Sequence, residues 1–371
     1  MGKIRILHLI KSLGRGGAEM LLPESLKLHN QDKFEFHYIY FLPWKSQMVA
    51  SIENAGGKVS CFNASNNFRM LLKYKEVIDY CKKEKINLIH CHLPWSGFLG
   101  RLIFRKVNLP VIYTEHNIQE HYHKVTKALN KYTYNNQSLA IGVSKDVTRS
   151  IKENIAPDIP VETVLNGVNT NFFKRNVEKG KKIRQYYGIP EEAIVLGNIA
   201  VFREQKALDV WIRAFAKIHE QDSSIYGIIV GAGPKEEEMK EQIKILELEN
   251  KIFLPGLQTD TVSYFSAMDI FMMSSTFEGL PVALLEAMSL NCAVITTAAG
   301  GVVEVVQDKK NGLICEVGNE KALAGLAINL LEDKDLRTNL QQKARERIKE
   351  HFSLSSMVSE LETIYLNKVK D

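Results

Sequence analysis

Apolar runs and longer amphipathic stretches alternate along the whole chain. This alternation is typical of parallel β-sheets whose faces are covered by helices. The clearest helical periodicity covers 67–85 in the first half and 206–219 and 234–248 in the second. The apolar runs predict strands near 4–10, 35–41, 58–62, 87–91, 110–114, 139–143 and 161–165, and again near 194–200, 226–230, 251–254, 269–273, 293–296 and 312–314.

One segment interrupts this alternation. Residues 166–190 are rich in Asn, Lys and Gly and have no apolar period, so they predict an inter-domain linker. A chain of 371 residues is long enough for two domains. The pattern therefore predicts an α/β protein with two doubly wound, Rossmann-like domains, 1–165 and 191–352, which face each other across a cleft. Ligands of such domains bind outside the carboxyl ends of the strands.

Composition places the chain among soluble globular proteins, with 45% hydrophobic and 25% charged residues. Apolar runs fall short of the roughly 18 residues that span a bilayer. The segment 1–10 is typical of a first buried strand and not of a signal peptide, so a cytoplasmic protein is expected. Five scattered cysteines without a C-x-x-C pair argue against a disulfide framework and against a zinc site.

The charge is distributed unevenly. Residues 1–165 hold 23 Lys and Arg against 14 Asp and Glu, a balance of +9, whereas the rest holds 25 against 29, a balance of −4. The first domain should therefore prefer anionic surfaces, unless its lysines serve only solubility. No helix-turn-helix or aromatic-and-basic RNA motif accompanies the charge, which argues against nucleic acid. An anionic bilayer or a phosphate-bearing lipid acceptor fits better.

The most informative segment is Ser274–Met288, which follows the apolar run 269–273. It contains Glu278 and Glu286, eight positions apart, with a turn made of Gly279, Leu280, Pro281 and Val282 after the first glutamate. Backbone amides at a helix start favour phosphate, and a nearby carboxylate can accept hydrogen bonds from sugar hydroxyls. The segment predicts a nucleotide-sugar site.

Two segments of the first half carry further candidate residues. Gly16 and Gly17 follow the first strand, where glycines let backbone approach a ligand. An NAD site is excluded, because Glu19 stands where Gly-x-G-x-x-G needs its third glycine and Tyr40-Phe41 replaces the acid that ends the second strand.

His116 follows the fifth strand and should project toward the cleft. His90 and His92 share one strand face and could imitate a metal site with His116. Because no matching carboxylate spacing supports a metal site, we interpret His90 and His92 as residues that line the cleft or that support its lining residues from behind.

Ser274–Met288 closely resembles the E-x7-E motif of the retaining glycosyltransferases of family 4, which have the GT-B fold. The resemblance implies that Glu278 holds sugar hydroxyls, that Glu286 holds the ribose, and that His116 contacts the donor sugar. It implies that the C-terminal domain binds the donor and the N-terminal domain the acceptor. The final helix, about 353–371, is expected to return to the first domain.

The resemblance extends over most of the chain, with one departure. Gly16-Gly17 resembles the family's first loop, which lies over the diphosphate, and Gly231-Ala232-Gly233-Pro234 resembles the loop under the nucleotide. The family's phosphate-clamping lysine corresponds to Lys206. Its arginine position holds Val201, and Arg203 is predicted to take over if the strand continues that far.

The resemblance implies a retaining, metal-independent hexosyltransferase without a cofactor. Such an enzyme would move a sugar from a UDP- or GDP-linked donor to a glycan or lipid-linked acceptor, in cell-surface polysaccharide synthesis and with peripheral contact to an anionic membrane. Two alternatives stay open: a GT-B nucleotide-sugar epimerase, and a non-catalytic nucleotide-sugar-binding subunit, which Val201 would favour.

Overall fold

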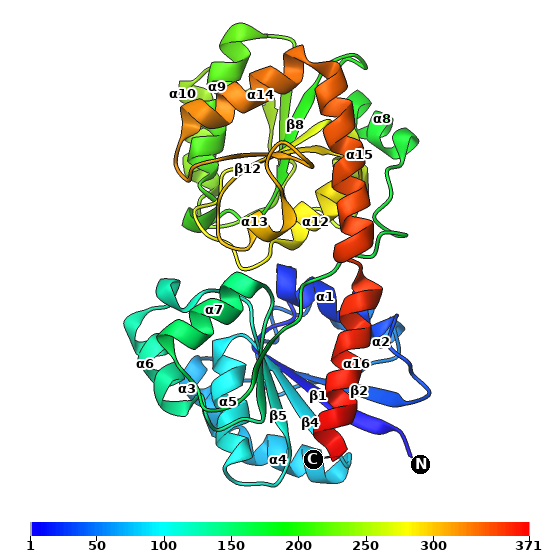
Figure 1. The fold of residues 1–371 in the computed structure, drawn as a ribbon, viewed down its shortest axis with the longest axis vertical. Coiled ribbons are helices and arrows are strands. Elements are labelled where there is room, and N and C mark those ends of the chain that lie inside the picture. Colours follow the sequence, from blue (N-terminus) through cyan, green and yellow to red (C-terminus); the bar gives the residue numbers. More distant parts are fainter. Residues whose placement is uncertain (1, 371) are drawn as a thin grey trace. The chain divides into compact units, whose positions relative to one another are not determined.

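The computed structural model describes residues 2–370, which divide into two compact units (Figure 1). Unit 1 comprises the described residues up to Gly167 together with those from Leu354 onward. Unit 2 is Val168–Ser353. Each unit is an α/β structure built on its own parallel sheet.

The sheet of unit 1 has seven parallel strands in the order β3-β2-β1-β4-β5-β6-β7. Its central strands are almost completely buried, because helices cover both faces of a parallel sheet. The strands are β1 (Ile4–Ile10), β2 (Phe34–Tyr40), β3 (Lys58–Cys61), β4 (Leu88–His92), β5 (Val111–Glu115), β6 (Leu139–Gly142) and β7 (Val161–Thr163).

Alternate residues of β4 show which helices cover which face of this sheet. A side chain at Gly100 of α5 would collide with Cys91, so Cys91 faces α5. The next residue back, His90, bonds Tyr365 of α16 on the opposite face. The helices are α1 (Gly17–Leu26), α2 (Val49–Asn54), α3 (Asn67–Leu72), α4 (Tyr74–Lys83), α5 (Pro94–Phe104), η1 (Gln119–His121), α6 (Lys124–Thr133), α7 (Lys145–Asn154) and α16 (Leu354–Lys370).

Unit 2 contains six parallel strands in the order β10-β9-β8-β11-β12-β13. They are β8 (Val195–Ile199), β9 (Tyr226–Val230), β10 (Ile252–Phe253), β11 (Ile270–Met273), β12 (Ala293–Thr297) and β13 (Leu313–Cys315). One hydrophobic core joins this sheet to α9 and α14, with Trp211 fully buried within it. The helices are α8 (Val177–Tyr186), η2 (Glu204–Lys206), α9 (Leu208–Gln221), α10 (Glu236–Ile245), α11 (Thr261–Ala267), α12 (Val282–Ser289), α13 (Val302–Val305), α14 (Glu320–Glu332) and α15 (Lys334–His351).

The structure confirms the predicted fold class and the thirteen predicted strands, with shifts of one or two residues at their ends. The helix predicted over 67–85 is instead two helices, α3 and α4, separated at Lys73. The prediction of a linker over 166–190 was wrong for its second part, because α8 (Val177–Tyr186) lies there and belongs to unit 2. Gly180 lets α8 approach the backbone of Ser266 closely, and this contact replaces a conventional apolar stripe.

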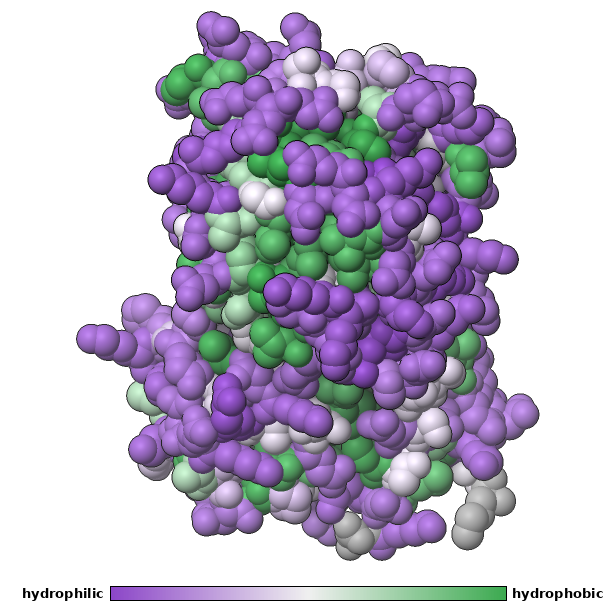
Figure 2. All heavy atoms as spheres, turned by 45° about the horizontal axis from the view of Figure 1, so that its top comes forward, coloured by the Kyte–Doolittle hydropathy of each residue, from purple (hydrophilic) through white to green (hydrophobic). Residues whose placement is uncertain are grey.

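The surface in the view of Figure 2 is mostly hydrophilic, with small separate hydrophobic patches. Among the helices described, none is both long and apolar enough to cross a bilayer. All five cysteines are free, and Cys61 is exposed.

Candidate functional site

The strand order of unit 2 reverses between β8 and β11, and ligands of doubly wound folds bind where this happens. The loops that follow these two strands carry the second half's main candidate residues. Backbone and side-chain hydrogen bonds join the loops: Thr276 N donates to Gln205 O (2.8 Å), and Ser274 Oγ donates to Lys206 O (2.9 Å). These hydrogen bonds hold the two loops of the site together.

Lys206 and Glu278 meet at this point. Lys206 Nζ donates to Glu278 Oε1 at 2.5 Å, and Ser275 Oγ donates to the same oxygen at 2.6 Å. Gln205 Nε2 lies 3.5 Å from the other carboxylate oxygen. The Glu278 side chain is 6% exposed and that of Lys206 is 23% exposed, so the lysine is the partner open to a ligand. An anion that binds here can replace Glu278 as the partner of Lys206, while Ser275 stays hydrogen-bonded to Glu278.

Arg203 lies near Lys206 but outside the strand. β8 ends at Ile199, so the condition that the strand continues to position 203 is not met. Arg203 instead precedes the short helix η2 and its side chain is exposed, whereas Val201 is half-buried. The alternation argument for Arg203 therefore does not apply, although its nearness to Lys206 in the chain remains.

Gly231 and Gly233 have a packing role that the sequence did not indicate. A Cβ on Gly231 would lie 1.8 Å from Ala200 O, and one on Gly233 would lie 2.4 Å from Phe202 O. Gly231 also has φ +143°, which L side chains rarely adopt. These glycines let their loop pack against residues 200–202, and this contact fixes the segment that leads to Lys206.

The turn after Glu278 leads into α12. Pro281 is the N-cap of this helix. Proline has no backbone N–H, so only Gly279, Leu280 and Val282 of the predicted amide donors can bind a phosphate. Glu286 is 5% exposed and lies within α12.

In unit 1 the strand order reverses between β1 and β4. Gly16 is the N-cap of α1, and Gly17 is its first residue. A Cβ on Gly16 would lie 2.4 Å from Glu19 Oε2, so this glycine makes room for the glutamate of its own loop. Ser12 Oγ also donates to Glu19 Oε1, at 3.3 Å.

Three buried histidines lie together in unit 1 on the face covered by α16. His8 Nδ1 and His92 Nε2 are 2.9 Å apart, and the two ring nitrogens of His90 lie 2.7 Å from Tyr365 Oη and Thr114 Oγ1. Burial lowers the pKa of His90 to about 3 and holds the pKa of His8 and His92 well below the ordinary value. Their ligand atoms lie within 4.8 Å of one another, and four of the six ring nitrogens already take part in hydrogen bonds.

The three histidines and His116 line one cavity, whose volume is about 40 Å³. His116 follows β5 directly, and its ring lies 5.8 Å from that of His92. Burial lowers the pKa of His116 to about 4, so the imidazole is neutral near pH 7. Its Nε2 atom is buried and has no hydrogen-bond partner within the described structure.

The sequence pattern missed two polar residues of these sites. Ser275 is fully buried and hydrogen-bonded to Glu278, and Glu115 is fully buried under the loop that carries His116. The position of Ser275, three residues before a candidate carboxylate, was a usable signal. Glu115 offered only its place at the end of an apolar strand.

Two family models match the chain. "Glycosyltransferase Family 4" matches residues 28–172, and "Glycosyl transferases group 1" matches residues 180–347. Among curated proteins, N-acetyl-alpha-D-glucosaminyl L-malate synthase of Bacillus anthracis is 28% identical over 305 residues, covering 80% of this chain and 78% of the relative. An N-acetylgalactosaminyltransferase of Campylobacter jejuni, named for a diphospho-undecaprenol-linked acceptor, is 27% identical and covers 92% and 93%.

Solved structures share the fold. HepE of Anabaena, in complex with UDP-glucose, superimposes with a TM-score of 0.88 at 22% identity, covering 97% of this chain and 99% of that one. A glycosyltransferase of Rickettsia africae gives a TM-score of 0.83 at 23% identity, with 100% of both chains covered.

Proposed function

Because this chain is a glycosyltransferase that belongs to family 4 and has the GT-B fold, we propose that it is a retaining, metal-independent hexosyltransferase. It moves a hexosyl unit from a nucleoside-diphosphate sugar to a hydroxyl of a glycan or lipid-linked acceptor, in cell-surface polysaccharide synthesis. The observation that carries the proposal is the contact between Lys206 and Glu278 at the strand-order reversal of unit 2. It brings a phosphate-binding cation and a hydroxyl-binding carboxylate to one point.

The main chemical task is to stabilise the leaving nucleoside diphosphate. Lys206 supplies a full positive charge, Arg203 is a second candidate, and the backbone amides at the start of α12 supply partial charge. Glu278, held by Ser275, accepts hydrogen bonds from the sugar hydroxyls, and Glu286 does so from the ribose. These groups support leaving-group stabilisation without a metal ion.

The nucleotide is UDP or GDP, and UDP is favoured by similar proteins. HepE of Anabaena has been solved with UDP, and a relative in Escherichia coli, 24% identical, is named for a UDP-galactose donor. The test is a transfer assay with UDP- and GDP-sugars in the presence of EDTA, with release of nucleoside diphosphate as the readout. A product whose anomeric configuration is inverted, by proton NMR, would contradict retention, and dependence on a divalent ion would contradict metal independence.

The same assay separates the two alternatives. An epimerase converts the donor sugar without any acceptor, which NMR of the donor detects. A binding subunit raises its melting temperature with nucleotide-sugar, by a stabilisation of roughly 2.7 kcal/mol at 100 times Kd, but transfers nothing to any acceptor tested.

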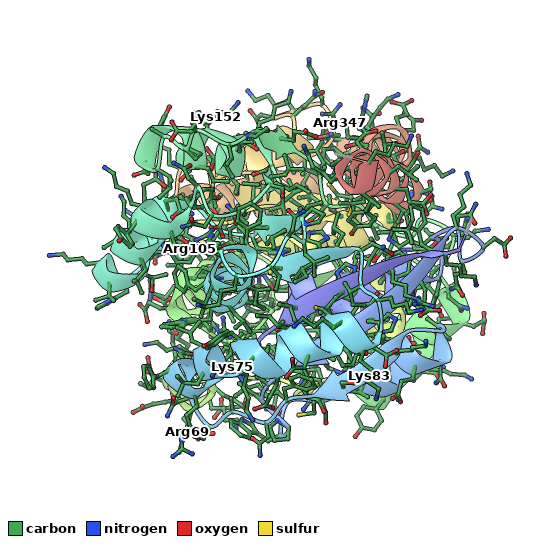
Figure 3. All side chains as sticks on the ribbon, turned by 90° about the horizontal axis from the view of Figure 1, so that it is seen from below. Arg69, Lys75, Lys83, Arg105, Lys152 and Arg347 are labelled. Atoms are coloured by element: carbon green, nitrogen blue, oxygen red, sulfur yellow. The ribbon has the colours of Figure 1, made fainter. Side chains whose placement is uncertain are left out.

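We further propose that the protein is cytoplasmic and reaches its acceptor at the inner face of the cell membrane through α3 and α6 of unit 1. Both helices contact α5, and both expose apolar side chains: Phe68 (69%) and Leu72 (58%) on α3, Val125 (57%) and Tyr132 (83%) on α6. The surrounding stretches 54–75 and 121–145 contain Lys and Arg but no Asp or Glu. Figure 3 labels Arg69, Lys75 and Arg105 on this side of unit 1.

Exposed apolar groups among cations favour an anionic lipid surface. The protein should therefore sediment with phosphatidylglycerol vesicles. The double variant Phe68→Ser with Tyr132→Ser should bind these vesicles more weakly. The matched control is Tyr186→Ser with Ile245→Ser, which removes apolar side chains of similar exposure from unit 2. Equal binding to phosphatidylcholine vesicles, or equal loss in both double variants, would contradict the assignment.

A further inference from the structure

Glu115 is a carboxylate without exposed surface at the carboxyl end of β5. Taking a charge out of water is costly unless hydrogen bonds satisfy it, so a residue of this kind in a sheet centre requires a reason. The position itself is notable, because the next residue in the chain is His116.

Five donors satisfy Glu115. Oε1 accepts from the backbone N–H groups of His116 (3.0 Å) and Asn117 (3.3 Å) and from Tyr122 Oη (2.5 Å). Oε2 accepts from Tyr113 Oη (2.9 Å) and from Gln119 Nε2 (2.6 Å). Four of these donors come from 116–122, so one carboxylate ties down both the start and the end of the segment that carries the histidine.

The network continues to a buried cation. Gln119 Oε1 accepts from Asn130 Nδ2 (3.0 Å), and Asn130 Oδ1 accepts from a guanidinium nitrogen of Arg101 (2.8 Å). Both amides and the guanidinium are buried, and Arg101 lies over the ring of Tyr113 at 4.7 Å. The chain of bonds has a fixed direction, with donors pointing from the cation toward the carboxylate.

We propose that Glu115 is the positioning residue of the unit 1 site: it fixes the backbone at His116 and so aims this imidazole at a sugar hydroxyl. The proposal rests on the proposed function. His116 lines the cavity, and the unpartnered Nε2 of its neutral ring can exchange a hydrogen bond with a hydroxyl group. Glu115 touches no substrate and acts only through the histidine.

Glu115→Gln is a sharp perturbation because it keeps the shape of the side chain. If the new amide NH₂ takes the place of Oε1, it faces two backbone N–H donors, which cannot turn. If it takes the place of Oε2, Gln119 and Asn130 must both flip, and the Asn130 NH₂ then faces the Arg101 guanidinium. Either orientation leaves two donors opposed, so the loop must shift.

The expected result is a fall in kcat of roughly 10- to 100-fold, since a displacement of about 1 Å can have this effect. The affinity for UDP, measured by calorimetry, should stay within about twofold. The groups proposed to bind the nucleotide lie in unit 2 and share no partner with Glu115, and sites of this kind act independently. Val111→Ala creates a cavity beside the same strand and is the control for lost stability. This variant should have a lower Tm and an unchanged kcat.

A double-mutant cycle decides between positioning and general support. Glu115→Gln added to His116→Ala should cause no further loss of kcat, because the residue on which Glu115 acts is gone. A further loss as large as in the wild-type background would overturn the proposal, and so would full activity of His116→Ala.

A second readout needs no turnover. Glu115→Gln should move the imidazole resonances of His116 in NMR spectra of the labelled protein, and unmoved resonances would overturn the proposal. Failure of the wild type to transfer any sugar would instead contradict the proposed function, and the NMR result would still test the positioning of His116.

Discussion

Acid should destabilise unit 1 selectively, because His8, His90 and His92 are buried in their neutral form. Each has a pKa in the folded chain below its ordinary value of 6.5. The unfolded chain therefore binds protons that the folded chain excludes as the pH falls below 6.5. Stability is complete above that pH and decreases toward the folded-state pKa, which is about 3 for His90.

The magnitude follows from the width of this window. His90, whose folded-state pKa is about 3, contributes about 2 kcal/mol between pH 6.5 and pH 5, at about 1.4 kcal/mol per pH unit. His8 and His92 change the stability in the same direction, because burial lowers the pKa of both. A loss of about 2 kcal/mol is already a large part of the stability of a typical domain, roughly 5–15 kcal/mol.

Urea unfolding at pH 7.5 and pH 5 measures the effect. Trp44→Phe with Trp95→Phe leaves Trp211 as a fluorescent reporter of unit 2 alone, while circular dichroism follows the whole chain. Two separated transitions should appear at pH 5. The transition of unit 1, which Trp211 does not report, should occur at a lower urea concentration than at pH 7.5. His90→Gln should reduce the pH dependence of that transition. An unchanged first transition, or equal shifts of both, would refute the reasoning.

Three further predictions concern catalysis. Lys206→Ala should lower turnover at least about 100-fold through loss of leaving-group stabilisation, while EDTA leaves the wild type active, and restoration by a divalent ion alone would contradict this. Glu286→Ala should weaken binding of free nucleoside diphosphate, whereas Glu278→Ala should spare it and reduce turnover, and calorimetry that finds equal losses would reverse the role assignment. Arg203→Ala should lose turnover about as severely as Lys206→Ala; near wild-type donor kinetics, with a gain in Val201→Arg, would show that Arg203 is a surface residue.

The sequence predicted the strands well because a strand buried on both faces must be an apolar run. It indicated Glu278, Glu286 and Lys206 as candidates because each occupies a recognisable local segment. It could not predict that Lys206 and Glu278 touch, since 72 residues separate them and only the order of β8 and β11 brings them together.

The hydrogen-bond network from Glu115 to Arg101 was not predictable for a related reason. Its members, at 101, 115, 119 and 130, are isolated polar residues in otherwise apolar or amphipathic segments, and nothing local marks them as partners. The helix α8 was missed because a close contact at Gly180 packs it, where a periodic apolar face would have been visible.

The place of α16 in unit 1 has a consequence for how the protein is made. Tyr365 bonds His90, and Glu362 binds His29 and the N–H of Asn30. All of unit 2 lies between these partners in the chain, so the ribosome synthesises unit 2 before it synthesises α16. Unit 1 therefore cannot be completed until residues 168–353 have been translated, and the sheet face that α16 covers lacks this helix during that time. Nascent chains halted within that interval should depend on chaperones, and they should lose this dependence once α16 has left the exit tunnel.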